Sequence, residues 1–127
     1  MKYNGKKVVG VWIDHKHAFV ISTPDRKNLG EFGVVNKIES KHHADHSSNE
    51  NAHHNKVAQE IHRLYENVSK HIVSDDAIFI TGPGTAQEEF KNFLKQDQHF
   101  RNKEIVIGTS DHPTENQRVA EVRNHFK

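Results

Sequence analysis

Histidine is the most chemically versatile residue of this chain, and five of its twelve histidines fall in one short segment. The segment runs from Glu39 to Asn55, reads ESKHHADHSSNENAHHN and contains no large apolar residue. Neutral imidazoles bind zinc and related metals, and protonated imidazoles add positive charge below about pH 6.5. Ser, Asn and Asp fill much of the remainder, so we predict a mobile, solvated loop at about residues 39–55.

One alternative for this loop is a metal site formed by His42, His43 and His46, with His53 and His54 as further ligands. Structural zinc sites depend mainly on cysteine, and this chain has none. A site made only of histidines needs ligands that rigid elements hold in place, and the loop offers no such framework. We therefore predict a solvated or partner-contacting loop, and no cofactor.

Carboxylates suggest a second chemistry, because a two-metal nuclease needs several of them to converge on one point. Asp14 ends the first predicted strand, where such an enzyme would hold a metal ion. Its potential companions are Glu60, Asp76, Asp111 and Glu115. Acids are also common in turns and at helix starts, so each position has a structural explanation. A metal-dependent phosphodiesterase that uses Asp14 is the alternative to a non-catalytic protein.

The stretch from Ile78 to Leu94, IFITGPGTAQEEFKNFL, joins a buried strand to an amphipathic helix through a tight turn. Thr85 and Glu88 have the spacing of a capping box. Backbone N–H groups at this helix start make Gly84 and Thr85 a candidate anion site. The lysine and the glycine spacing of a P-loop are absent, so a tight turn that needs small residues is the simpler interpretation.

The elements that must position these residues follow from the hydrophobic pattern, which predicts the order β-β-β-α-β-α-β-α. Strands are predicted at 8–13, 17–23 and 29–38, with a bend or bulge at Gly30 and Gly33 in the third. A helix begins at Lys56, where apolar residues start to recur at helical spacing. Thr114 and Gln117 predict a capping box for the last helix.

This order predicts an α/β fold. The link between the first two strands is too short for a parallel crossover, so the first three strands form an antiparallel meander. Two right-handed crossovers then add the later strands, which gives a mixed five-stranded sheet of order 3-2-1-4-5 with helices on both faces. This is the ribonuclease-H-like arrangement, which hosts both enzymes and binding modules.

Length and composition limit the number of domains, the kinds of partner and the cellular compartment that we expect. The length of 127 residues suits one domain spanning 1–127, and 18 basic against 17 acidic residues do not demand a nucleic-acid partner. The start MKYNGKK lacks the pattern of a signal peptide, and no stretch is long and apolar enough for a membrane span. With no cysteine, these features favour a cytoplasmic protein without a membrane partner.

The run AIFITGPGTAQEEFKNFL resembles the strand, Gly-Pro-Gly turn and helix in the middle domain of Pelota and the archaeal and eukaryotic class 1 peptide-chain release factors. VWIDHKHAFVI, a third strand, a variable loop, a long helix and KEIVIGTSD fit the same order, so the resemblance covers about Val8 to Phe126. A stand-alone domain of this type is similar to bacterial members of that superfamily.

The resemblance implies a function in translation. Release factors carry Gly-Gly-Gln in the loop before the first helix, but residues 41–56 of this chain contain neither a glycine nor a Gly-Gln pair. In this respect the chain is similar to Pelota, which also lacks the motif. We therefore expect a non-catalytic module that contacts the ribosome or tRNA. The expected contact residues are Lys41, His42, His43, His46, His53, His54 and Lys56. A protein-protein interaction module without nucleic acid is a further alternative.

Overall fold

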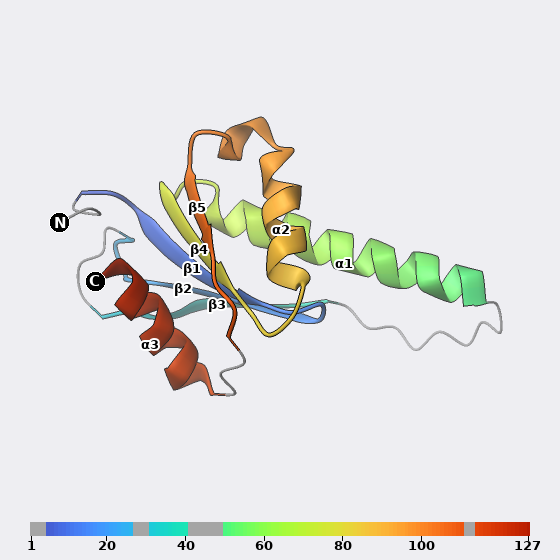
Figure 1. Cartoon of the computed structure of the whole chain (residues 1–127), viewed down its shortest axis with the longest axis horizontal. Coiled ribbons are helices and arrows are strands. Elements are labelled where there is room, and N and C mark those ends of the chain that lie inside the picture. The colour runs from blue at the N-terminus through green and yellow to red at the C-terminus, as the bar shows by residue number, and fades with distance from the viewer. Residues whose placement is uncertain (1–4, 27–30, 41–49, 111–113) are drawn as a thin grey trace.

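The computed structural model describes residues 5–26, 31–40, 50–110 and 114–127, with only the backbone described for 50–55. The elements follow the predicted order (Figure 1). The strands are β1 (Val8–Ile13), β2 (His17–Ser22), β3 (Gly33–Glu39), β4 (Ala77–Thr81) and β5 (Glu104–Ile107). The helices are α1 (Glu50–Ile72), α2 (Ala86–Lys95), the short 3-10 helix η1 (Gln98–Phe100) and α3 (Glu115–Phe126).

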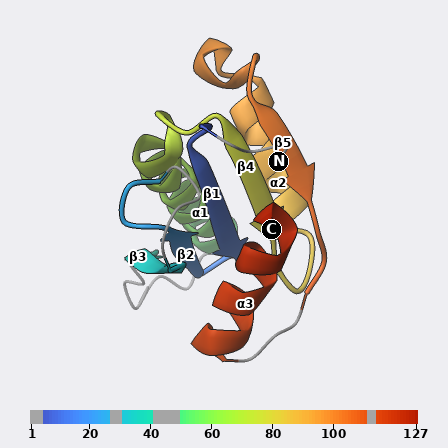
Figure 2. The same ribbon diagram turned by 90° about the vertical axis from the view of Figure 1, so that its left-hand side faces the viewer.

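The five strands form one mixed sheet of order β3-β2-β1-β4-β5, which confirms the predicted fold class. β1 pairs antiparallel with β2 and parallel with β4, so β1 and β4 occupy the middle of the sheet. The two helices α1 and α2 cover one face and α3 covers the other (Figure 2). The ribonuclease-H-like assignment stays a prediction.

The core lies on both sides of this sheet. Every residue of β1 and β4 is buried, as their continuous apolar runs predict. The larger layer includes Leu64 and Val68 of α1 and Phe90 of α2, and the smaller layer includes Val122 and Phe126 of α3. Each such side chain contributes about 1.5–3 kcal/mol when it is fully buried, so packing of the helices against β1 and β4 stabilises the fold.

The helix α1 begins earlier than the sequence pattern predicts. Glu39 closes β3 and Glu50 opens α1, so the predicted loop at 39–55 is too long, and His53 and His54 lie within the helix. Residues 50–55 have no large apolar side chain, so hydrophobic periodicity could not reveal this first part of the helix. The segment 41–49, with His42, His43 and His46, lies outside the described residues, as does Asp111.

Two local predictions about strand and helix ends are wrong. The irregularity of β3 lies at Val35, because Val34 pairs with Ile21 and Asn36 pairs with Val20, whereas Gly33 pairs normally. Gly30, the other predicted position, lies outside the described residues. Thr85 has helical backbone angles and makes no side-chain cap. Its hydroxyl donates instead to Oε2 of Glu89, at 3.0 Å. The capping box of Thr114 and Gln117 at the start of α3 is confirmed.

The turn between β4 and α2 depends on one of its two glycines. A Cβ atom at Gly82 would lie 2.1 Å from the carbonyl oxygen of Ile13 at the end of β1, whereas a Cβ at Gly84 would meet nothing within 4 Å. The carbonyl oxygen of Gly82 also accepts hydrogen bonds from the backbone N–H of Ser110, at 2.8 Å, and from Nε2 of Gln87, at 3.1 Å. Gly82 is therefore the residue that lets β4 turn beside the end of β1.

We predict that Gly82→Ala destabilises the protein by about 3 kcal/mol, because backbone atoms at the end of β1 must move to admit the methyl group. The matched control Gly84→Ala should leave the stability within about 1 kcal/mol of wild type. Urea unfolding followed by the fluorescence of Trp12, the single tryptophan, measures both values. Equal effects of the two substitutions would contradict this account.

Candidate functional site

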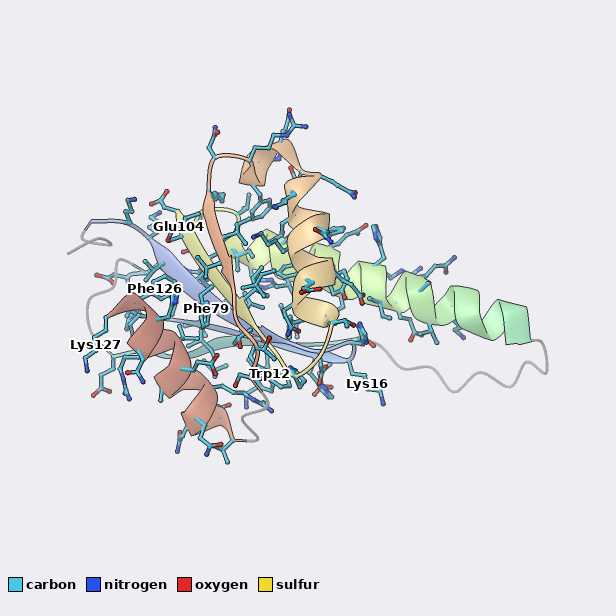
Figure 3. All side chains as sticks on the ribbon, in the orientation of Figure 1. Trp12, Lys16, Phe79, Glu104, Phe126 and Lys127 are labelled. Atoms are coloured by element: carbon cyan, nitrogen blue, oxygen red, sulfur yellow. The ribbon has the colours of Figure 1, made fainter. Side chains whose placement is uncertain are left out.

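Three parts of the chain meet at the end of the sheet where the parallel strands β1 and β4 finish. They are the β1–β2 hairpin, whose tip is marked by Lys16 in Figure 3, the turn before α2, and the middle of α1. Ligands of open α/β sheets bind beyond the carboxyl ends of the strands. The same end carries Ser40, the last described residue before segment 41–49, whose N–H donates to the carbonyl of Lys16 at 2.8 Å.

A hydrogen-bond network centred on Glu89 joins these three parts. Oε1 of Glu89 accepts from the hydroxyl of Tyr65 on α1 at 3.0 Å, and Oε2 accepts from Thr85 at 3.0 Å. Nε2 of His15, at the hairpin, lies 3.2 Å from both oxygens. Since the carboxylate can only accept, Nε2 carries the proton that is shared with Glu89.

Burial and the hydrogen bonds of this network shift the pKa values of Glu89 and Tyr65. Partial burial raises the pKa of Glu89, but the hydrogen bonds from Tyr65, Thr85 and His15 outweigh it, so the pKa lies below its ordinary value. Burial, together with the hydrogen bond and the negative charge of Glu89, raises the pKa of Tyr65. At neutral pH the site therefore holds an ionised carboxylate, a neutral phenol and an oriented imidazole.

Asp14 has a structural role in the same hairpin. Its Oδ1 accepts the backbone N–H groups of Lys16, at 2.8 Å, and His17, at 2.6 Å. These bonds fix the chain reversal between β1 and β2, as Asp commonly does in turns.

The described carboxylates do not converge as a two-metal site requires. Asp14 follows β1 and Asp76 precedes β4, so they lie at opposite ends of paired parallel strands. Asp76 is level with Lys7, seven residues before Asp14, which is a separation of about 23 Å along the strands. Glu115 pairs with Nζ of Lys37 at 3.0 Å, and Glu60 lines a hollow of about 240 Å³ beside Arg63. No group of three His, Asp or Glu side chains within the described residues is placed to hold a metal ion.

The predicted partner-contact residues are only partly located. Lys56 is half-buried on α1, and the backbone of His53 and His54 belongs to the same helix. The other predicted contact residues, Lys41, His42, His43 and His46, lie outside the described residues. Gly84 and Thr85 are exposed at the start of α2, so the anion site stays a prediction.

Sequence reasoning missed the site around Glu89. The four-residue spacing of Thr85 and Glu89 on one helix was visible, and it is the spacing at which helical side chains meet. The contributions of His15 and Tyr65 could not be read from spacing, because they come from elements 74 and 24 residues away in the sequence.

The opposite end of the sheet holds a buried charge. The side chain of Asp75 has no exposure and its Oδ2 pairs with Nη1 of Arg26, while its Oδ1 has no hydrogen-bond partner among the described residues. Burial raises the pKa of Asp75 to about 6, against the opposing effects of Arg26, Lys103 and Lys7. Arg26 adopts a φ of 61°, in the left-handed region, and also donates to the carbonyl of His71 at 3.0 Å.

No helix in the described part of the chain is long and apolar enough to cross a bilayer. Neither a protein-family model nor a curated protein sequence matches the chain.

Two solved structures share the fold. The crystal structure of the archaeal translation termination factor aRF1 has a TM-score of 0.55 and 12% identity, over 92% of this chain and 34% of that one. Pelota from Archaeoglobus fulgidus has a TM-score of 0.55 and 14% identity, over 98% of this chain and 35% of that one. The chain therefore spans about a third of either relative. This likeness confirms, at the level of the fold, the predicted resemblance to their middle domain.

We predict that Tyr65→Phe costs about 1 kcal/mol at neutral pH, because the substitution removes a charge-assisted hydrogen bond to Glu89. The lowered pKa of Glu89 means that this contribution is present above its ordinary value of 4.5 and is lost as pH falls through the lower folded value. Urea unfolding at pH 7 and at pH 3 measures the change. In the Glu89→Gln background the same substitution should cost clearly less, and an undiminished cost would show that the two side chains are not coupled.

We also predict that Asp75 makes the protein less stable as pH rises from about 4 to about 6. The raised pKa means that the folded state binds the proton more tightly than the unfolded state, whose ordinary value is 3.8. Relative to Asp75→Asn, the wild-type protein should lose about 2 kcal/mol between pH 4 and pH 7. Histidines titrate in both proteins and cancel in this difference, so parallel stability curves would refute the assignment to Asp75.

Proposed function

We propose that this chain is a non-catalytic module of the translation machinery that contacts the ribosome or tRNA. The fold it shares with a translation termination factor and with Pelota supports this proposal. The proposed setting is the cytoplasm, and the proposed unit is a single domain over residues 1–127. The described carboxylates offer no converging set that would favour the phosphodiesterase alternative.

The observation that carries the proposal is the projection of α1. Figure 1 shows that the N-terminal part of α1 extends beyond the sheet. A helix of 23 residues is about 34 Å long, and among its described side chains those that pack in the core begin at Ile61 and Leu64. The described side chains of residues 56–60 lie outside the core and are available to a partner.

The chemistry of this region suits RNA. The contact residues proposed are Lys41, His42, His43, His46, His53, His54 and Lys56. Lysines contact phosphate groups, and histidine rings stack on unpaired bases and gain charge as pH falls. Without a glycine or a Gly-Gln pair in 41–56, the proposal includes contact but not the release of peptides from tRNA.

We predict that the protein binds ribosomes or tRNA with an affinity that falls with salt and rises between pH 7.5 and pH 6. A variant with the seven contact residues changed to Gln should lose most of this binding and should have a shallower salt dependence, by about 0.7 to 0.9 in log–log slope per lost phosphate contact. Filter binding and sedimentation with ribosomes measure both quantities.

The matched control is Lys91→Gln combined with Arg123→Gln, which removes two cations on α2 and α3 and should bind as wild type does. Circular dichroism checks that each variant keeps its helices. Absence of binding at low salt near pH 6, or undiminished binding by the seven-residue variant, would refute the proposal.

A further inference from the structure

A second polar site lies away from the His-rich segment, where α2 ends and η1 begins. A shallow hollow of about 460 Å³ lies there and is widely open to solvent. Its lining residues are Phe93, Gln96, Asp97, Gln98, His99 and Arg101. All of them lie within nine consecutive residues, 93–101, so one compact turn of chain builds the hollow.

A carboxylate–imidazole pair is oriented in this hollow. Oδ1 of Asp97 accepts from the backbone N–H of His99 at 2.9 Å and lies 2.7 Å from Nδ1 of its ring. Both hydrogen bonds lower the pKa of Asp97, so the carboxylate stays ionised and accepts a hydrogen bond from Nδ1–H of His99. The ring is therefore held in one orientation, and Nε2 is the nitrogen left for a ligand.

The remaining polar side chains of the hollow are not engaged elsewhere in the described part of the chain. The guanidinium of Arg101 has no carboxylate partner there, in contrast to Arg26, which pairs with Asp75. The side-chain amides of Gln96 and Gln98 have no hydrogen-bond partner among the same residues. The guanidinium and the two amides thus lie without partners among the described residues, beside the imidazole that Asp97 orients and the half-buried ring of Phe93.

We propose that this hollow binds a nucleotide, either free or as an unstacked residue of single-stranded RNA. A guanidinium binds phosphate oxygens in a bidentate manner. Nε2 of His99 is an acceptor when Nδ1 carries the proton, so it can accept a hydrogen bond from a ribose hydroxyl. Glutamine amides match the hydrogen-bonding edge of adenine, and the half-buried ring of Phe93, which also packs against other aromatic rings, adds an apolar contact for the base. Five of the lining residues therefore supply contacts for the phosphate, the ribose and the base.

This inference does not rest on the proposed function. The hollow uses α2 and η1, whereas the proposed ribosome or tRNA contact uses segment 41–56. A chain with the seven contact residues changed to Gln would still bind a nucleotide here, and a chain that fails to bind ribosomes could do so as well. The two proposals therefore fail separately.

The test titrates the full chain with AMP, with adenosine, with inorganic phosphate and with the hexanucleotide rA6, by NMR with ¹⁵N-labelled protein. AMP should shift the amide signals of residues 93–101, and adenosine and phosphate should each bind more weakly than AMP. Arg101→Gln should weaken AMP binding about tenfold or more, because a charged hydrogen-bond donor is lost. The control Arg123→Gln, an exposed cation on α3, should bind AMP as wild type does.

The two ligand sources give different results. Tighter binding of rA6 than of AMP at the same signals identifies an RNA residue as the ligand, and equal or weaker binding identifies a free nucleotide. Absence of shifts with AMP and rA6 at millimolar concentration would overturn the inference. Shifts confined to other parts of the chain, or an Arg101→Gln variant that binds as wild type does, would also overturn it.

Discussion

The close approach of Gly82 to the carbonyl of Ile13 is the contact on which the end of the sheet where β1 and β4 finish depends. Because no side chain stands between them, β4 can leave the sheet directly beside the end of β1. The carbonyl of Gly82 then accepts one hydrogen bond from Ser110, in the chain after β5, and another from Gln87, in the first turn of α2. Two residues further along α2, the side chain of Glu89 contacts His15 of the β1–β2 hairpin and Tyr65 of α1. A steric requirement at one glycine thus determines where the polar network forms.

The carboxylates at the two ends of the sheet, Glu89 and Asp75, have pKa values that are shifted in opposite directions. Glu89 is half exposed, satisfied by donors from three elements and shifted toward ionisation. Asp75 is fully buried, incompletely satisfied and shifted toward the neutral form, although Arg26 pairs with it. The free-energy cost of burying the Asp75 carboxylate exceeds what a single ion pair with Arg26 recovers. Asp75 therefore has a structural role, and its contribution to stability changes with pH. The Glu89 end keeps its charged and polar groups near solvent, where a partner can reach them.

The sequence predicted the features that burial and local spacing control. Continuous apolar runs located β1 and β4, short links gave the strand order, and Thr114 with Gln117 gave a cap that the structure confirms. It failed where an interaction was not periodic or not local. Residues 50–55 of α1 include no large apolar residue that would reveal a helix, and the hydroxyl of Thr85 donates to Glu89 instead of capping α2. The network of His15, Tyr65 and Glu89 exists only because folding brings together residues far apart in the sequence.

The likeness to two translation proteins at 12% and 14% identity shows how little of the sequence the fold requires. Apolar residues on both faces of β1 and β4 meet that requirement, so they carry little information about function. Function must then depend on parts that the core does not shape. Residues 56–60 of α1 meet this condition, because their described side chains lie outside the core and the helix is propagated through them from its packed part. A partner that packs against them would add stabilisation that the sheet does not provide.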